Sequence, residues 1–420
     1  MTADLLADQV QSVEAIRQSF PALARRHAGQ PVAYFDGPGG TQVPQPVIDA
    51  VADYLAHHNA NTHWAYPTSE ETDAIITAAR RSLADFLNAD PDEVAFGANM
   101  TTLTFHLARA LGRRWGPGDE IVITELDHHA NVGPWQAVAR ERGVTLKVVP
   151  FRPESGELDW DALGRVIGSK TRLVAIGAAS NALGTITDVA KAREMARGVG
   201  ALVFVDAVHF APHRLVDVRA LGCDFLTCST YKFYGPHVGV LYGRRDRMKS
   251  LDLPKLEPAP ESVPERLETG TLNHEGIAGA GAAVEWLASL ADGGSRRERL
   301  TRLYTTQHER EVALFARLWE GLGSIKGVTR YGPAPSRPRT GTVSLSIAGV
   351  TAHDAAVSLA AEGVFASSGD FYATTVVERL GFAREGLLRI GLSIYSTASE
   401  VERVLAGVQR IARRTVLPVT

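Results

Sequence analysis

The chain has only two cysteines, Cys223 and Cys228, among its 420 residues. Two thiols exclude a disulfide framework and a metal site built from four cysteine ligands. No stretch approaches the roughly 18 consecutive apolar residues that a membrane span requires. The N-terminal segment carries acidic residues and no apolar core, so it does not predict a secretory signal. We therefore expect a cytoplasmic protein with no membrane partner.

The sequence also lacks a surplus of either charge. Its 44 Lys and Arg residues face 47 Asp and Glu residues, which gives a net charge of −3. Proteins that hold nucleic acid carry clustered Lys and Arg, so we expect no nucleic-acid partner. The composition, 45% hydrophobic and 22% charged, is that of a globular protein with a large core. A chain of this length predicts about two or three domains.

Short apolar runs alternate with helical patterns through the middle of the sequence. Five of these runs are predicted strands: Glu120 to Glu125, Val144 to Val149, Arg172 to Gly177, Ala201 to Asp206 and Val238 to Gly243. Runs that are apolar on both faces, separated by helices, are typical of a mostly parallel sheet covered on both sides. The large domain is therefore expected to be α/β.

The pattern changes after the proline-rich stretch 253–264. Long helical patterns at 281–290 and 300–322 are followed by an alternating strand at 342–349. We expect an N-terminal helical segment at 1–30, a large α/β domain at 31–290 and a small C-terminal α+β domain at 291–420.

Lys232, one of only seven lysines, is the first candidate for chemistry. It lies in the segment CSTYKFYGPHVGV, between two aromatic residues and just before a Gly-Pro turn. A lysine in apolar surroundings is desolvated, which favours the neutral amine that condenses with a carbonyl group. A lysine that extends its amine to solvent from a strand edge would fit the same segment.

Asp206 ends the predicted strand ALVFVD, and ligands bind at the carboxyl ends of parallel strands. A carboxylate after five apolar residues is costly to bury unless a positive group meets it. Asp206 could instead cap a helix. His209, three residues later, could be a hydrogen-bonded core histidine.

Two further segments suggest a ligand site. His128 and His129 follow the predicted strand EIVITE. Neighbouring side chains diverge on a strand and no third ligand is suitably spaced, which disfavours a metal. One imidazole could lie flat against a ligand ring. The turn GANMTT, Gly97 to Thr102, opens a helical pattern, and helix N-termini bind phosphate. The segment FDGPGG lacks the lysine of a P-loop and is interpreted as a turn.

Taken in order, these segments resemble the class V aminotransferase group of pyridoxal 5′-phosphate (PLP) enzymes, in particular its cysteine desulfurase-like branch. The resemblance runs from about Tyr34 to Leu405 and rests on the phosphate turn, HHANVGPW, SNALGT, VDAVH, STYKFYGP, ETGTLNHEG and LRIGLSIYST. It implies PLP as cofactor and an amino acid as substrate. It also implies the aspartate aminotransferase-like fold (PLP-dependent fold type I), with a mixed, mostly parallel sheet, and a homodimer with shared active sites.

The resemblance implies roles for individual residues. Lys232 matches the lysine that binds PLP covalently, Asp206 the acid at the pyridine nitrogen, and His128 the histidine that stacks on the ring. His209 is placed near the phenolic oxygen. The implied phosphate contacts are Asn99, Met100, Thr101, Ser229 and Tyr231, with Thr271 reaching the phosphate of the partner subunit. Tyr231 departs from the histidine common at its position. Asn181 and Arg389 match the groups that hold the substrate carboxylate.

Another set could contact the substrate and tune which bond breaks, or could be ordinary interface packing: His63, Trp64, Tyr66, Phe371 and Tyr372. We place His63 at the substrate.

One departure from the family decides the expected reaction. Desulfurases carry a nucleophilic cysteine on a loop before the last core strands, and the corresponding region here, residues 362–382, contains none. We therefore expect a C–S lyase that eliminates a thiol from an S-substituted cysteine, leaving pyruvate and ammonia. Transamination, epimerisation and decarboxylation-linked oxidative deamination are the alternatives, and a non-catalytic PLP-binding protein is a third possibility.

Overall fold

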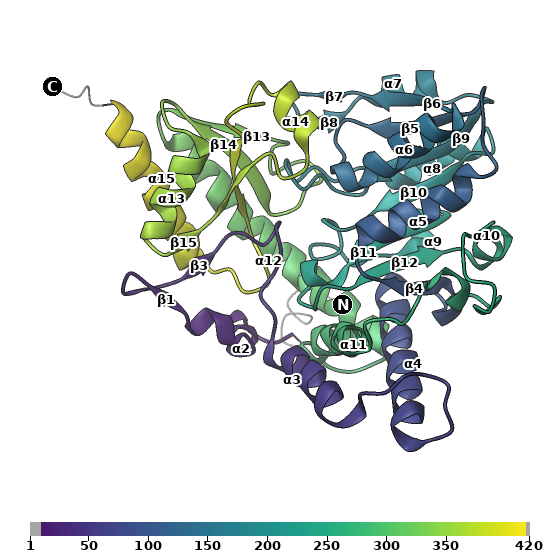
Figure 1. Ribbon diagram of the computed structural model, residues 1–420. Coiled ribbons are helices and arrows are strands. Elements are labelled where there is room, and N and C mark those ends of the chain that lie inside the picture. The colour runs from purple at the N-terminus through teal and green to yellow at the C-terminus, as the bar shows by residue number, and fades with distance from the viewer. Residues whose placement is uncertain (1–9, 417–420) are drawn as a thin grey trace.

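The computed structural model describes residues 10–416. A seven-stranded sheet with strand order β4-β12-β11-β10-β9-β5-β6 forms the centre of the larger unit (Figure 1). Its strands are β4 (Val94–Gly97), β5 (Glu120–Thr124), β6 (Thr145–Val149), β9 (Thr171–Gly177), β10 (Leu202–Asp206), β11 (Phe225–Ser229) and β12 (Gly239–Gly243). β12 runs antiparallel to both of its neighbours, and the other neighbouring pairs are parallel. The expected α/β fold with a mixed, mostly parallel sheet is confirmed.

Both faces of this sheet are buried, because successive side chains of a strand point to opposite sides. Phe204 and Phe225 belong to the core on one face, which is covered by α5 (Met100–Gly112), α6 (Gly133–Arg142) and α10 (Arg245–Ser250). Val203 and Leu226 belong to the core on the other face, under α4 (Pro67–Leu87), α7 (Trp160–Val166), α8 (Val189–Arg197) and α11 (His274–Ser289). This double coverage explains the continuous apolar runs in the sequence.

The smaller unit contains a four-stranded antiparallel sheet, order β13-β14-β17-β16. Its strands are β13 (Val328–Tyr331), β14 (Thr342–Ile347), β16 (Ser367–Gly369) and β17 (Leu387–Gly391). Helices α13 (Ala352–Ala361) and α15 (Ala398–Val416) supply further residues to its core. The expected C-terminal α+β unit is thus present.

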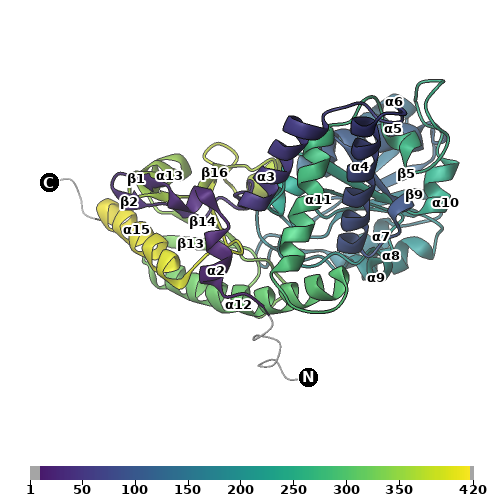
Figure 2. The same cartoon turned by 90° about the horizontal axis from the view of Figure 1, so that it is seen from below.

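Helix α12 (Arg296–Ser324) belongs to both units. Leu300 and Leu303 lie in the core of the larger unit, whereas Phe315 and Leu318 lie in the core of the smaller one. Figure 2 shows α12 running beneath both units. The proposed boundary at residues 290 and 291 therefore falls just before a helix that the two units share.

The start of the chain differs from the expected division. Residues 1–9 of the proposed N-terminal helical segment lie outside the described residues. The rest contains one short helix, α2 (Val13–Gln18), the turn η1 (Pro21–Ala24) and the strands β1 (Arg26–His27) and β2 (Gln30–Pro31). β3 (Ala33–Tyr34) pairs with β15 (Val364–Phe365). The residues just after position 31 therefore join the smaller unit, because β15 accepts hydrogen bonds from their backbone. The chain enters the larger unit only after this strand.

Short elements complete the described chain: α3 (Gln45–Asp53), η2 (Tyr54–His58), η3 (Pro91–Glu93), η4 (His129–Asn131), β7 (Phe151–Arg152), β8 (Glu157–Leu158), α9 (Val218–Leu221), η5 (Thr230–Lys232), η6 (Glu265–Leu267) and α14 (Thr374–Arg379). No helix within residues 10–416 is long and apolar enough to cross a membrane.

Candidate active site

The carboxyl ends of the parallel strands meet at one edge of the large sheet and surround a cavity. Five strands contribute side chains at or after their ends: Met100 and Thr101 after β4, Asp127 and His128 after β5, Asn181 after β9, Asp206 and His209 at the end of β10, and Tyr231 and Lys232 after β11. The topology therefore brings together residues that are far apart in the sequence.

Lys232 is buried, with 8% of its surface exposed. Its Nζ donates to the carbonyl of Gly39 at 3.0 Å and to that of Pro38. Burial, reinforced by the charge of Arg389 and opposed by that of Asp206, lowers the pKa of Lys232 to about 7. A substantial fraction of the amine is thus neutral near neutral pH. The segment FDGPGG, interpreted from the sequence as a turn, supplies the carbonyls that hold it.

Asp206 lies at the end of β10, and its Oδ1 accepts from the backbone N–H of Val208 at 2.9 Å. Burial raises the pKa of Asp206 to about 6, against the opposing effects of that hydrogen bond and of Lys232. A cation in the cavity would stabilise the ionised carboxylate.

Asp127 is a second buried acid in the cavity, and it was not among the predicted site residues. Its carboxylate accepts from the Thr124 hydroxyl at 2.7 Å and from the Asn131 amide at 3.0 Å. Burial, with a smaller effect of the charge on Asp206, raises the pKa of Asp127 to about 7. A Cβ on Gly177 would lie 2.6 Å from Asp127 Oδ1, so this approach requires glycine. The sequence signal that could have identified Asp127 is its position next to the two histidines, just after a predicted strand.

His128 presents a neutral ring. Its Nδ1 accepts from the backbone N–H of Ala130 at 3.0 Å, which places the imidazole hydrogen on Nε2. Burial, followed by the charges of Lys232 and Arg389, lowers the pKa of His128 to about 4. A neutral ring in the cavity can stack on a planar ligand.

His209 is buried and has one nitrogen without a partner. Its Nε2 lies 3.1 Å from the hydroxyl oxygens of both Thr340 and Thr342. Its Nδ1 makes no hydrogen bond among the described residues. Burial, followed by the charge of His213, lowers the pKa of His209 well below its ordinary value. A buried nitrogen of this kind is costly unless a ligand atom meets it.

The N-terminus of α5 forms another wall. Asn99 caps this helix by accepting from the backbone N–H of Thr102 at 2.9 Å. The backbone N–H of Met100 donates to Ser229 Oγ at 3.0 Å. A Cβ on Gly239 would lie 2.4 Å from the Asn99 carbonyl carbon, so glycine allows the two segments to meet. A helix N-terminus with hydroxyl groups beside it suits an anion. Tyr231 turns its ring onto His237, at 4.8 Å between ring centres.

Arg389 reaches the cavity from β17 of the smaller unit. One terminal nitrogen donates to the carbonyl of Asn181 at 3.0 Å, and its Nε has no partner among the described residues. The amide of Asn181 donates to the carbonyl of Phe371 at 2.9 Å and leaves its own Oδ1 unpaired. Burial, against the opposing charge of Asp36, lowers the pKa of Arg389 to about 9. Asp36 is itself partly buried, and burial raises its pKa. This acid was also missed by sequence reasoning.

His63 and Thr271 do not reach this cavity. Both line a second hollow of the same protomer, together with Asp73, Arg80 and Glu268. His63 Nδ1 lies 3.1 Å from Asp73. Within one protomer His63 lies away from this cavity, because the long connection before α4 carries it to another face, and its place at the substrate stays a prediction. For Thr271 the prediction concerned the partner subunit.

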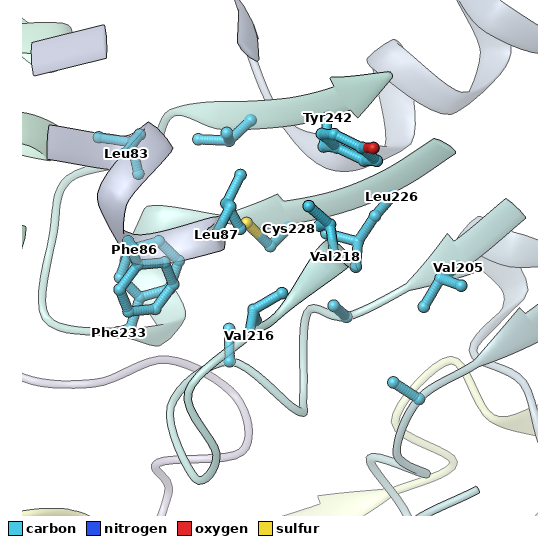
Figure 3. Packing of buried hydrophobic residues seen from close by; sticks show 14 of the residues in the cluster. Leu83, Phe86, Leu87, Val205, Val216, Val218, Leu226, Cys228, Phe233 and Tyr242 are labelled. Atoms are coloured by element: carbon cyan, nitrogen blue, oxygen red, sulfur yellow. The ribbon is translucent and has the colours of Figure 1, made fainter. Parts of the chain in front are cut away.

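Neither cysteine reaches the cavity. Cys223 and Cys228 are 1% and 0% exposed. Figure 3 shows Cys228 packed among apolar side chains that include Leu87 and Val218. Burial raises the pKa of both thiols far above its ordinary value. Both are therefore inert core residues, as the sequence predicted. Across residues 10–416, no group of three or more His, Cys, Asp or Glu residues is arranged to hold a metal ion.

The chain belongs to the aminotransferase class-V family, whose model matches residues 33–404. It is therefore an enzyme of a PLP-dependent family. It is 34% identical over 419 residues to a cysteine desulfurase of Pectobacterium carotovorum subsp. carotovorum, covering 96% of this chain and 98% of that protein. It is 35% identical over 416 residues to a cysteine desulfurase of Klebsiella pneumoniae, covering 95% and 98%.

The fold of this chain is also similar to that of solved structures. The apo structure of a cysteine desulfurase from Thermococcus onnurineus matches with a TM-score of 0.86 at 29% identity, covering 96% of this chain and 98% of that one. The match confirms the resemblance and the fold inferred from the sequence.

Proposed function

We propose that this enzyme is a C–S lyase that eliminates a thiol from Cβ of an S-substituted cysteine, giving pyruvate and ammonia after hydrolysis. The observation that carries the proposal is the burial of both cysteines, Cys223 and Cys228. The sulfur of a substrate therefore has no thiol of this chain to attack it. A sulfur that leaves as a free thiol needs none.

The cavity suits PLP. The amine of Lys232 is buried and its pKa is lowered to about 7, so a substantial fraction is neutral near neutral pH, which favours covalent attachment of an aldehyde. The unpaired Nδ1 of His209 matches a phenolic oxygen, and the carboxylate of Asp206 matches a protonated ring nitrogen. His128 would stack on the ring. The phosphate would lie at the N-terminus of α5, with Asn99, Met100, Thr101, Ser229 and Tyr231. When bound, PLP supplies an electron sink for the pair released at Cα.

The remaining steps belong to side chains of this chain. Arg389 would hold the substrate carboxylate through its unpaired Nε–H, and Asn181 through an N–H of its side-chain amide. This grip orients Cα toward Lys232. Lys232 would then take the Cα proton, a contribution of about 10²–10⁴ in rate for a positioned base.

We also propose that the active enzyme is a homodimer in which Thr271 and His63 serve the site of the partner subunit. Both lie on one hollow of the protomer that is separate from its own active-site cavity. Large apolar side chains are exposed on neighbouring segments, with Trp64 61% and Leu256 65% exposed. Such surfaces usually lie in interfaces, and a two-fold dimer is the commonest arrangement.

The test is product analysis with PLP-loaded protein and a series of S-alkyl and S-aryl cysteines. The proposal expects pyruvate, ammonia and the free thiol in equal amounts. A keto acid that keeps the sulfur would show transamination and would overturn the proposal.

A second candidate is cysteine desulfuration, favoured by the names of the relatives. In this case sulfur would pass to a thiol of another molecule and leave alanine, whereas elimination of hydrogen sulfide from cysteine leaves pyruvate. The double variant Cys223→Ala/Cys228→Ala adds an internal check. It is expected to keep the activity of the parent within about twofold, with a stability loss of about 1–3 kcal/mol in total. Loss of turnover in a folded double variant would indicate a cysteine nucleophile and would overturn the lyase proposal.

A further inference from the structure

The segment before α14 holds two aromatic residues in an unusual backbone conformation. Phe371 and Tyr372 have φ angles of 58° and 55°, a region that residues with a Cβ rarely adopt. Two site residues hold this segment. Asn181 Nδ2 donates to the carbonyl of Phe371 at 2.9 Å, and the backbone N–H of His129 donates to the carbonyl of Tyr372 at 2.7 Å. Backbone strain held in this way clusters at functional sites.

The two side chains point to different parts of the site. Phe371 packs against Arg389, with the guanidinium carbon 4.0 Å from the ring centre. The ring centre of Tyr372 lies 5.5 Å from that of His128, which lines the cavity. The Tyr372 side chain is otherwise open, with 72% of the residue exposed. Its hydroxyl makes no hydrogen bond to any described residue.

This arrangement places the exposed phenol of Tyr372 beside a residue that lines the cavity. With the substrate carboxylate at Arg389 and Cα near Lys232, the inner side of the cavity is closed by buried residues such as Asp206. Tyr372, in contrast, is exposed and lies beside His128, so a substituent on Cβ that extends to solvent on the side of His128 would meet its ring. The O–H of a phenol can donate a hydrogen bond.

We propose that Tyr372 is the general acid for the leaving sulfur. As the C–S bond breaks, its electron pair goes to sulfur and the phenolic proton passes to the same atom, so a neutral thiol departs. The phenolate is exposed and regains a proton from water. Lys232 takes the Cα proton on the inner side, so the two proton transfers use different groups. This inference rests on the proposed lyase function and assigns its second proton transfer.

The test compares Tyr372→Phe with the parent enzyme on two substrates, S-ethylcysteine and S-(4-nitrophenyl)cysteine, by thiol release in a single turnover. Ethanethiolate is a basic leaving group that needs a proton, and its release is expected to slow by about 10²-fold. Nitrophenylthiolate leaves without a proton, and its release is expected to change less than about twofold, since a Brønsted dependence disappears for a weak base. The aromatic ring is retained, so packing against His128 is preserved.

A matched control is Tyr331→Phe, which removes a hydroxyl bonded to Ser346 at 3.1 Å on β13. It is expected to leave both rates unchanged. Equal slowing of both substrates by Tyr372→Phe, or no slowing of either, would overturn the role of Tyr372 while the parent still produced pyruvate. Failure of the parent to release thiol and pyruvate from either substrate would overturn the lyase function itself, and this proposal with it.

Discussion

The guanidinium of Arg389 lies over the ring of Phe371, with its carbon 4.0 Å from the ring centre. Both residues are held by Asn181, which accepts from Arg389 through its carbonyl and donates to the Phe371 carbonyl through its amide. The three residues therefore form one unit that sets the direction of the arginine. This unit links β17 of the smaller unit to the segment after β9 of the larger one.

Substituting Phe371→Leu tests this unit. A buried cation–π contact contributes about 1–2 kcal/mol, so loss of the ring is expected to raise KM for the amino acid about tenfold. The limiting rate should change much less, because the reacting groups stay in place. Steady-state kinetics separate the two parameters. A fall in kcat at unchanged KM would contradict a role in holding the carboxylate.

Asp206→Asn is expected to separate stability from activity. Its pKa of about 6 lies above the ordinary value, so the folded apoprotein binds an extra proton between about pH 4 and 6 and loses stability as pH rises through that window. The asparagine side chain of the variant does not titrate, so its folding stability does not fall in this pH range. The variant apoprotein should therefore be no less stable than the parent at pH 8. Activity with PLP should fall at least about a hundredfold, because a buried cation loses its partner.

Thermal unfolding of the apoprotein at pH 4 and pH 8 measures the first effect. Turnover of the loaded protein measures the second. A variant that is less stable than the parent only at pH 8 would show that the carboxylate stabilises the empty site, against this account.

The lowered pKa of Lys232 predicts how attachment of the cofactor depends on pH. The rate at which the apoprotein binds PLP covalently should rise with pH and level off above about 7. The same lowered pKa also determines how the folding stability changes with pH. The folded state releases this proton near pH 7 and the unfolded chain near pH 10, so the lysine contributes to a rise in stability between these values.

Absorbance changes after mixing with PLP measure the rate, and borohydride reduction followed by peptide mass spectrometry locates the adduct. Lys232→Ala should give no adduct at this position. A rate that keeps rising to about pH 10 would mean that the amine is solvated rather than buried.

Mixing two inactive variants tests the shared active sites. Lys232→Ala removes one component of a site, and the double variant His63→Ala/Thr271→Ala removes the components proposed to come from the partner subunit. In randomly mixed two-fold dimers, half of the dimers are hybrids with one complete site, so about a quarter of the parent activity should return. The two proteins are unfolded and refolded together, and turnover is compared with that of each refolded alone. No recovery in hybrids that are shown to form would contradict the proposal.

The sequence predicted the parts of the molecule that depend on local patterns. The five predicted strands are β5, β6, β9, β10 and β12, because strands buried on both faces leave unbroken apolar runs. Lys232, Asp206 and His128 line one cavity because parallel strands end at one edge.

Features that depend on distant contacts could not be predicted in this way. Lys232 donates to carbonyls almost two hundred positions earlier, and nothing local in FDGPGG indicates this contact. The pairing of β3 with β15 is even more remote in sequence. The acids Asp36 and Asp127 were missed because their surroundings, not their neighbours in the chain, bury them.

The helix that runs through both hydrophobic cores, α12, has a consequence for how the protein melts. The N-terminal half of α12 cannot lose its packing without loosening the C-terminal half, because both halves belong to one continuous hydrogen-bonded helix. Arg389 lies on β17 of the smaller unit and Lys232 follows β11 of the larger one, so the role proposed for each depends on one of the two cores that α12 joins. Denaturation should therefore abolish both in a single cooperative event, rather than leave a folded half that still captures the coenzyme.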